Sequence, residues 1–131
     1  MDDSTAEVVR QWLRKAANDL QNIRNNLSAT EVPTDTICFH AQQAIEKLLK
    51  GVLVANGRSV SKTHDLVRLL TDVTDILPEL APFEEQFEDV SEYGVAVRYP
   101  NGFSEPTLGE ASRAYEIAMK VSEIVHHKIN I

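Results

Sequence analysis

A chain of 131 residues with 43% apolar side chains can bury a core without a disulfide or metal, and we expect one domain over residues 1–131. Its formal net charge of −7 excludes a protein that coats DNA non-specifically, because phosphate contacts need clustered cations. No apolar run approaches the ~20 residues of a membrane span, and the start MDDSTAEVV is acidic where a secretion signal is basic, so we expect a cytoplasmic protein without membrane contact.

A first helix is expected over residues 4–28, with Ser4 as its N-cap and Glu7 completing a capping box. Its apolar residues fall within an arc of about 100°, the width of one core-facing stripe. They are Val9, Trp12, Leu13, Ala16, Leu20, Ile23 and Leu27. The polar side is expected to carry Arg10, Arg14, Asp19 and Arg24.

A second helix is expected after Pro33, with Thr34 or Asp35 as its cap and Asn56-Gly57 as its end. Its core face consists of Ile37, Ala41, Ala44, Ile45, Leu48 and Val52. Leu49 and Leu53 widen that stripe, which predicts a central helix covered on more than one side. The lone Cys38 lies in this pattern and is expected to be a buried apolar thiol.

Two short helices and one long helix complete the expected fold. Ser61 or Thr63 is expected to cap a helix over 66–77, Pro78 and Pro82 mark a loop, and an acidic helix covers 83–93. After a loop over 94–106, Thr107 and Glu110 form a second capping box for a helix over 107–129. The prediction is an all-α, antiparallel up-and-down bundle of about five helices, three long and two short.

Three segments together resemble the HEPN family. They are ICFHAQQAIEKLLKGVLVANG, then KTHDLVRLL, then YGVAVRYP before the last helix. The resemblance implies a helical bundle that forms a homodimer and associates with a minimal nucleotidyltransferase, often as a toxin–antitoxin pair. It also implies that some members are metal-independent ribonucleases and that others bind nucleotides.

The nuclease members carry an arginine, four to six residues and a histidine near the start of the last helix. Here neither Arg98 nor Arg113 is followed by a histidine at that spacing. Arg58 and His64 match the spacing but lie between the second and third helices, where the family motif does not occur, and such short matches arise readily by chance.

The residues around the second and third helices are the main candidates for a site. His40, Gln43 and Lys47 form a polar strip that either contacts a nucleotide or RNA, or hydrogen-bonds the backbone at a helix seam. Lys62, His64 and Asp65 either form an anion site with the exposed helix amides or a simple capping turn. We expect these two groups to meet beside one hydrophobic core.

Arg98 and Tyr99 are candidates for a phosphate contact and for base stacking, although Arg98 could equally neutralise its acidic neighbours. Adjacent His126 and His127 point about 100° apart, so they cannot share a metal ion, and no metal site or cofactor is expected beyond a nucleotide ligand.

The charge is unevenly distributed: residues 46–68 hold five Lys or Arg against two acids, whereas residues 71–110 hold ten acids against Arg98 alone. The acidic half could therefore attract another copy or a basic partner. We expect a homodimer that uses the widened apolar face of the second helix and the aromatic residues of 83–103.

Three hypotheses about function follow. The preferred one is a non-catalytic HEPN-type interaction or nucleotide-binding module that partners a minimal nucleotidyltransferase. The alternative is a metal-independent ribonuclease toxin that uses His64 or His40 for acid–base chemistry and Arg58 or Arg98 as a phosphate clamp. The third is a structural bundle without a ligand.

Overall fold

The computed structural model describes residues 1–95 and 105–131, and for Val95 only the backbone. Within these residues the chain forms five α-helices and one 3-10 helix, without a β-strand. They are α1 (Asp3–Leu27), α2 (Thr34–Ala55), α3 (Leu66–Val73), η1 (Pro78–Phe83), α4 (Glu84–Val95) and α5 (Leu108–Lys128). The expected all-α bundle with three long helices is confirmed.

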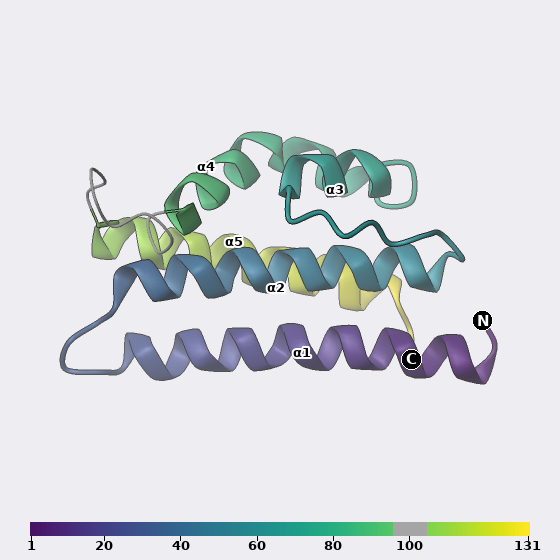
Figure 1. The fold of residues 1–131 in the computed structure, drawn as a ribbon, viewed down its shortest axis with the longest axis horizontal. Helices are drawn as coiled ribbons and strands as arrows, with labels where there is room; N and C mark the ends of the chain where they lie inside the picture. Colours follow the sequence, from purple (N-terminus) through teal and green to yellow (C-terminus); the bar gives the residue numbers. More distant parts are fainter. Residues whose placement is uncertain (96–104) are drawn as a thin grey trace.

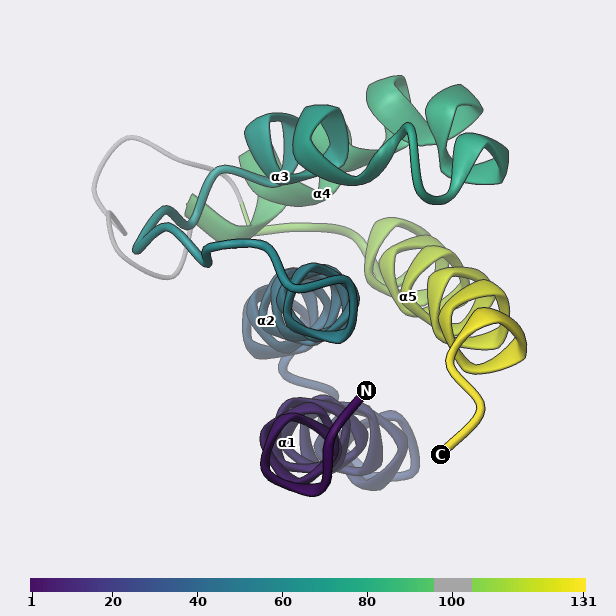
Figure 2. The same ribbon diagram turned by 90° about the vertical axis from the view of Figure 1, so that its right-hand side faces the viewer.

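The helices form three layers, with α2 in the middle layer, and the longer helices alternate in direction. Figures 1 and 2 show α1 on one side of α2, α3 and α4 on the other, and α5 beside α2. The direction reverses from α1 to α2, and again from α4 to α5 (Figure 1), as an up-and-down bundle requires. The central position of α2 explains its sequence, because a helix covered on several sides must be apolar around most of its circumference.

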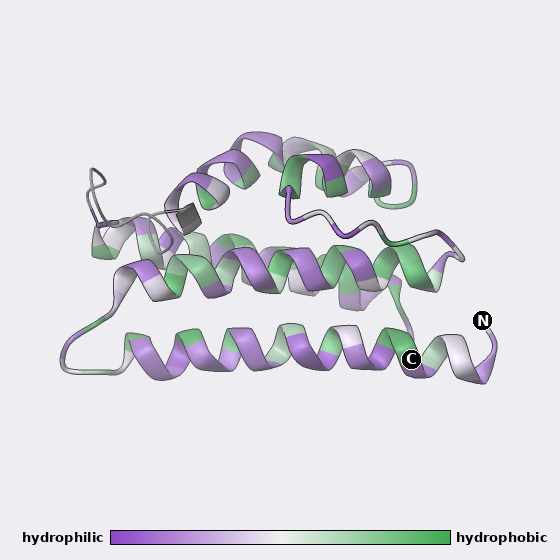
Figure 3. Ribbon diagram, viewed as in Figure 1, coloured by the Kyte–Doolittle hydropathy of each residue, from purple (hydrophilic) through white to green (hydrophobic). Residues whose placement is uncertain are grey.

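The predicted core face of α2 is confirmed at every position. Its six residues have no exposed area, and Leu49 and Leu53 are also covered by the chain itself. Green and purple alternate along α1 in Figure 3, as one apolar stripe requires, and Val9, Ala16, Leu20 and Ile23 are buried on that stripe. Trp12 and Leu13 are only half-buried at its edges.

The burial of Leu49, Leu53 and Phe87 contradicts part of the basis for the expected dimer interface. Leu49 and Leu53 are 0% and 2% exposed, and Phe87 of α4 is fully buried. These side chains are already in contact with other helices of the same chain, so they have no apolar surface left to offer a second copy.

Two of the predicted helix boundaries are confirmed in detail. Thr107 and Glu110 make the predicted capping box, in which each side chain accepts the other residue's backbone N–H, at 3.0 and 2.9 Å. Gly57 has a φ of +69° after α2, the left-handed conformation that glycine adopts at little cost.

Other predicted caps are wrong because a neighbouring residue takes the role. Asp2, not Ser4, caps α1 and accepts the backbone N–H of Thr5 at 2.7 Å. Pro33 occupies the N-cap position of α2, where no side chain makes a capping hydrogen bond.

The third-helix region also differs from the prediction. Asp65 caps α3 in place of Ser61 or Thr63, and α3 ends at Val73 rather than near residue 77. The expected loop at Pro78 and Pro82 is the 3-10 helix η1, whose tighter turn suits a short proline-containing segment.

The loop expected over 94–106 begins later than predicted. Gly94 is buried within α4, where a Cβ atom would lie 2.1 Å from Oε1 of Gln42. Glycine therefore leaves room for the Gln42 side chain of α2 to lie against the backbone of α4 at this point.

Candidate functional site

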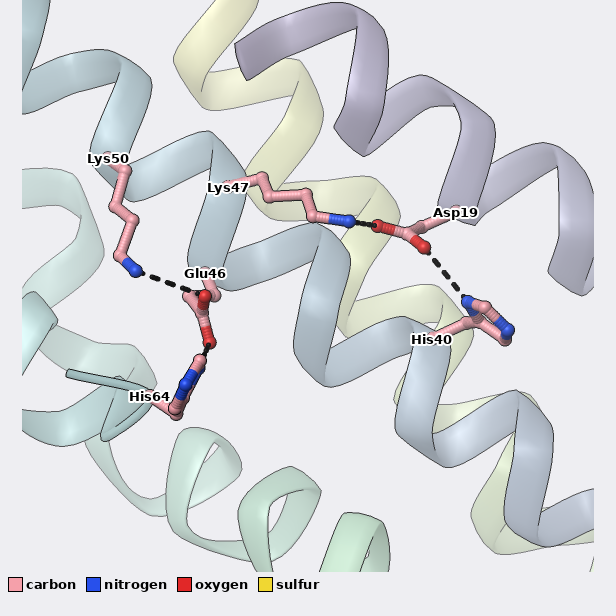
Figure 4. A network of polar contacts seen from close by, with 6 residues as sticks. All are labelled: Asp19, His40, Glu46, Lys47, Lys50 and His64. Atoms are coloured by element: carbon pink, nitrogen blue, oxygen red, sulfur yellow. Dashed lines mark hydrogen bonds and ion pairs between the residues drawn. The ribbon is translucent and has the colours of Figure 1, made fainter. Parts of the chain in front are cut away.

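The polar residues of α2 form two clusters on different flanks of the helix rather than the single site expected from the sequence. Figure 4 shows His40 and Lys47 directed toward Asp19 of α1, whereas Glu46 is directed toward His64 in the loop before α3 and Lys50 is directed toward Glu46. Consecutive residues of an α-helix point about 100° apart, so Glu46 and Lys47 serve different neighbours. The expectation that His40 and His64 share one polar edge is therefore wrong.

The first group, here named the Asp19 cluster, consists of Asp19, His40 and Lys47. Oδ1 of Asp19 lies 2.9 Å from Nδ1 of His40, and Oδ2 lies 2.6 Å from Nζ of Lys47. The side chains of Asp19, Lys47 and His40 are 10, 22 and 24% exposed. One nearly buried carboxylate thus satisfies two residues that the sequence offered as ligand contacts, and it fixes α1 against α2.

The second group, here named the Glu46 cluster, consists of Glu46, Lys50 and His64. Oε2 of Glu46 accepts a hydrogen bond from Nζ of Lys50 at 3.1 Å, and Oε1 lies 2.8 Å from Nδ1 of His64. Glu46 and Lys50 have side chains only 5 and 7% exposed. Lys50 also lies over the ring of Trp12, 5.7 Å from its centroid, within the range of a cation–π contact.

His64 differs from the other members because its side chain is 60% exposed. A carboxylate can only accept, so the proton of a neutral His64 is assigned to Nδ1, which donates to Glu46. Nε2 then carries the lone pair, and it has no protein partner among the residues that the structure describes. His64 is thus an oriented imidazole with its basic nitrogen accessible.

Arg58 is bound to the end of α3 rather than directed at His64. Its Nη1 donates to the carbonyl of Asp72 at 2.9 Å and to Oδ1 of Asp75 at 2.8 Å, and its Nη2 pairs with Oδ2 of Asp75. The hydrogen bond from Arg58 lowers the pKa of Asp75, and the same contact raises the pKa of Arg58. The arginine anchors the connecting loop to the segment that follows α3.

Asp65 accepts hydrogen bonds from the backbone amides at the start of α3, which an anion bound there would need. Its Oδ1 accepts the backbone N–H of Val67 at 3.1 Å and that of Arg68 at 3.3 Å, while Oγ1 of Thr63 accepts the N–H of Asp65. The capping-turn interpretation of this segment therefore describes its geometry. Lys62 is exposed and makes no ion pair with an acid of residues 1–95 or 105–131.

The remaining candidate residues, Gln43, Arg98 and Tyr99, belong to neither cluster. Gln43 is half-buried on α2, between the directions of the two clusters. Arg98 and Tyr99 lie outside the described residues. No group of three His, Cys, Asp or Glu side chains in the described ranges is arranged to hold a metal ion, and none of their helices is long and apolar enough to cross a membrane.

The structure adds three residues that the sequence analysis did not propose as site residues: Asp19, Glu46 and Lys50. Asp19 was assigned to the polar side of the first helix, but it borders the apolar stripe and is 7% exposed as a whole residue. Glu46 and Lys50 stand four residues apart on α2, a spacing that favours an ion pair and could have identified them.

Cys38 matches its expectation of a buried thiol. It has no exposed area, and burial, with the negative charges of Glu110 and Asp35, raises its pKa to about 12. A thiol in this state is a poor nucleophile, so Cys38 contributes packing rather than chemistry.

Comparisons with known proteins agree with this architecture. No curated protein matches the chain. The crystal structure of TT1696 from Thermus thermophilus is similar, with a TM-score of 0.80 and 28% sequence identity over 92% of this chain and 98% of that one. The family model described as the HEPN domain matches residues 9–128, from the first core position of α1 to the end of α5. The chain belongs to the HEPN family.

Proposed function

We propose that this chain is a non-catalytic HEPN module that binds the phosphate groups of a nucleotide or of RNA and acts with a protein partner. The observation that carries the non-catalytic part of the proposal is the internal pairing of its cations. Lys47 is held by Asp19, Lys50 by Glu46 and Arg58 by Asp75. Cations that are already neutralised stabilise the fold and are poorly suited to act as the phosphate clamp of a nuclease.

The missing nuclease motif supports the same proposal. Neither Arg98 nor Arg113 is followed by a histidine at the spacing of the nuclease members. His126 and His127 are the histidines nearest to the C-terminus, and both lie at the end of α5, far along the chain from either arginine.

The proposed ligand contacts are Lys62 and His64. Both are exposed, they stand two residues apart in the loop before α3, and Nε2 of His64 is accessible. An ammonium group and an imidazole are a suitable pair for a phosphate. Arg98 and Tyr99 are proposed to add a second phosphate contact and a stacking surface.

The proposed protein partners are a second copy and a minimal nucleotidyltransferase with a basic surface. Residues 78–95 contain no Lys, Arg or His, and this stretch exposes Glu79, Glu84, Glu85, Glu88 and Glu92. An acidic surface of this kind attracts a basic partner and increases its rate of association. Co-expression with a small nucleotidyltransferase tests the pairing, and a Glu84→Lys, Glu88→Lys variant should elute without the partner if this surface is used.

Thermal denaturation with millimolar ATP tests the ligand. A ligand present at about a hundred times its Kd stabilises the folded state by about 2.7 kcal/mol, which raises Tm by several degrees. Lys62→Ala and His64→Ala should each reduce the shift, and Lys120→Ala on α5 is the matched control that should retain it. No shift in the unmodified protein would favour a structural bundle, and an equal shift in all variants would place the ligand elsewhere.

Ribonuclease activity is the second candidate, because the Glu46–His64 contact has the geometry of an oriented general base. A carboxylate on Nδ1 leaves Nε2 free to take a proton from a ribose hydroxyl. Incubation of the purified protein with RNA in the presence of a chelator separates the two functions. Cleavage that His64→Ala abolishes and Lys120→Ala preserves would replace the non-catalytic proposal.

A further inference from the structure

The four histidines of the chain differ in whether a carboxylate lies against Nδ1 and in whether the ring is open to solvent. Nδ1 of His64 lies 2.8 Å from a carboxylate oxygen, and Nδ1 of His40 lies 2.9 Å from another. The His64 side chain is 60% exposed, whereas that of His40 is 24% exposed. His126 and His127 are exposed at the end of α5, but neither pairs with an acid among the described residues. His64 therefore combines an oriented ring with an accessible one.

The carboxylate that faces His64 is itself firmly held. The Glu46 side chain is only 5% exposed, and its other oxygen accepts a hydrogen bond from Nζ of Lys50 at 3.1 Å. Lys50 is 7% exposed and lies over the ring of Trp12 (Figure 4 shows the polar members of this chain of contacts). A carboxylate that accepts the Nδ1 proton fixes the ring and makes the opposite nitrogen more electron-rich. The packing of α2 thus supports the reactivity of a nitrogen at the surface.

An imidazole held in this way is a nucleophile as well as a base. When the lone pair of Nε2 attacks an electrophile, the ring becomes positively charged, and a carboxylate on Nδ1 stabilises that charge. The Nδ1 proton remains in the hydrogen bond to Glu46, so no proton has to leave the ring before the attack. Lys62, two residues earlier in the same loop, is exposed and offers an ammonium to the oxygens of an anionic electrophile. These features together favour a phosphoryl group as the electrophile.

We propose, extending the phosphate contact by Lys62 and His64 that forms part of the proposed function, that Nε2 of His64 accepts a phosphoryl group from a small acyl phosphate. The lone pair of Nε2 forms a bond to phosphorus, while the bond between phosphorus and the acyl oxygen breaks and its electron pair leaves with the carboxylate. A carboxylate is a weak base, so this leaving group needs no proton from the protein. The product is a phosphoramidate on His64, with Lys62 as its counter-ion and Glu46 bound to the imidazolium.

Incubation of the full chain with acetyl phosphate tests the site. The intact mass should rise by one phosphoryl group, which acid removes and alkali preserves, as a phosphorus–nitrogen bond requires. Peptide mapping at alkaline pH should place the group on His64, at a rate on the order of tenfold above that of His126 or His127. His64→Asn should abolish the main product. The double variant His126→Asn, His127→Asn should leave it unchanged, because both side chains are remote from Glu46 in the chain and unpaired within the described residues.

Glu46 acts as a positioning residue, and the double variant Glu46→Gln, Lys50→Met removes its charge together with the buried counter-ion. The phosphorylation rate of His64 should then fall by roughly tenfold or more relative to the α5 histidines of the same molecule, with far-UV circular dichroism unchanged. A merely structural role would leave this ratio as it is. Lys62→Ala is a second variant, at an exposed position where folding is not at risk, and it should slow the reaction several-fold. Lys120→Ala on α5 is its matched control and should not.

Three results would each overturn the acceptor site. They are equal rates at His64 and the α5 histidines, an unaltered ratio in the double variant, and acetylation of Lys62 without a phosphoryl group on His64. The nucleotide site is judged separately by the melting assay with ATP. A chain that ATP stabilises but that gains no phosphoryl group retains the proposed function and loses the acceptor site. A chain phosphorylated at His64 that ATP does not stabilise supports the acceptor site and overturns nucleotide binding.

Discussion

Replacing Glu46 by glutamine keeps the size of the side chain but removes the negative charge between Lys50 and His64. The Lys50 side chain is 7% exposed, and its ammonium lies 3.1 Å from Glu46. An ammonium left buried without a counter-charge costs about 3–5 kcal/mol, because little water reaches it. The free energy of unfolding of a domain is only about 5–15 kcal/mol, so Glu46→Gln should remove a large share of it.

Urea denaturation followed by far-UV circular dichroism at neutral pH measures this loss. A double variant, Glu46→Gln with Lys50→Met, removes both charges and should recover most of the stability. Asp75→Asn is the matched control, since it breaks the ion pair with Arg58 at a site where both side chains are well exposed, and its effect should be far smaller.

Two results would refute the structural role of the Glu46 cluster. One is a loss below about 1 kcal/mol for Glu46→Gln, which would mean that Lys50 reaches water in solution. The other is a double variant as unstable as the single one. A gain in stability would instead indicate a strained functional group, as in sites that sacrifice stability for activity.

Two further predictions concern buried positions. The pKa of the Cys38 thiol is raised from 9.0 to about 12. A thiol reagent at mildly alkaline pH should therefore label Cys38 in the folded protein on the order of a thousandfold more slowly than in the unfolded protein. Comparable labelling rates in the two states would contradict the burial of Cys38. The neutral thiol therefore contributes stability below pH 9 that is lost as the pH rises toward 12, which a urea titration at increasing pH can follow. Gly94→Ala places a Cβ 2.1 Å from Oε1 of Gln42, the far end of a flexible side chain that can turn away, so it should cost at most about 1 kcal/mol in the same urea assay. Gln42→Ala should remove that contact, and a loss of several kcal/mol in Gly94→Ala would show that the Gln42 side chain is held in place.

The features predicted well from the sequence are those that depend on one helix at a time. The core face of α2 follows from the helical repeat alone, because its apolar residues recur at the period that keeps them on one side. The capping box of Thr107 and Glu110 is equally local, since both partners lie within one turn.

The caps that were wrongly assigned lie where several capping residues stand together. Asp2 and Ser4 can both accept a helix amide, as can Thr63 and Asp65, and the choice depends on where the chain enters the bundle. Tertiary packing fixes that entry point, and the sequence does not reveal it.

The division of the candidate site into two clusters could not be predicted from the sequence, for a related reason. Helical spacing shows that Glu46 and Lys47 point in different directions, but not which residue faces each of them across the bundle. Asp19, which binds Lys47, lies on α1, 28 residues before it in the chain. His64, which binds Glu46, lies in a loop 18 residues after it. Such pairings over long distances in the chain arise only when the helices have packed.

The adjacency of Glu46 and Lys47 also limits how α2 can move. Turning this helix about its own axis toward α1 would pull Glu46 from His64, and turning it the other way would pull Lys47 from Asp19. Rotation of α2 in either direction is therefore opposed by a polar side-chain contact. A ligand that captured His64 would loosen one of these restraints, and α1, on the far side of the molecule, would be the element positioned to respond.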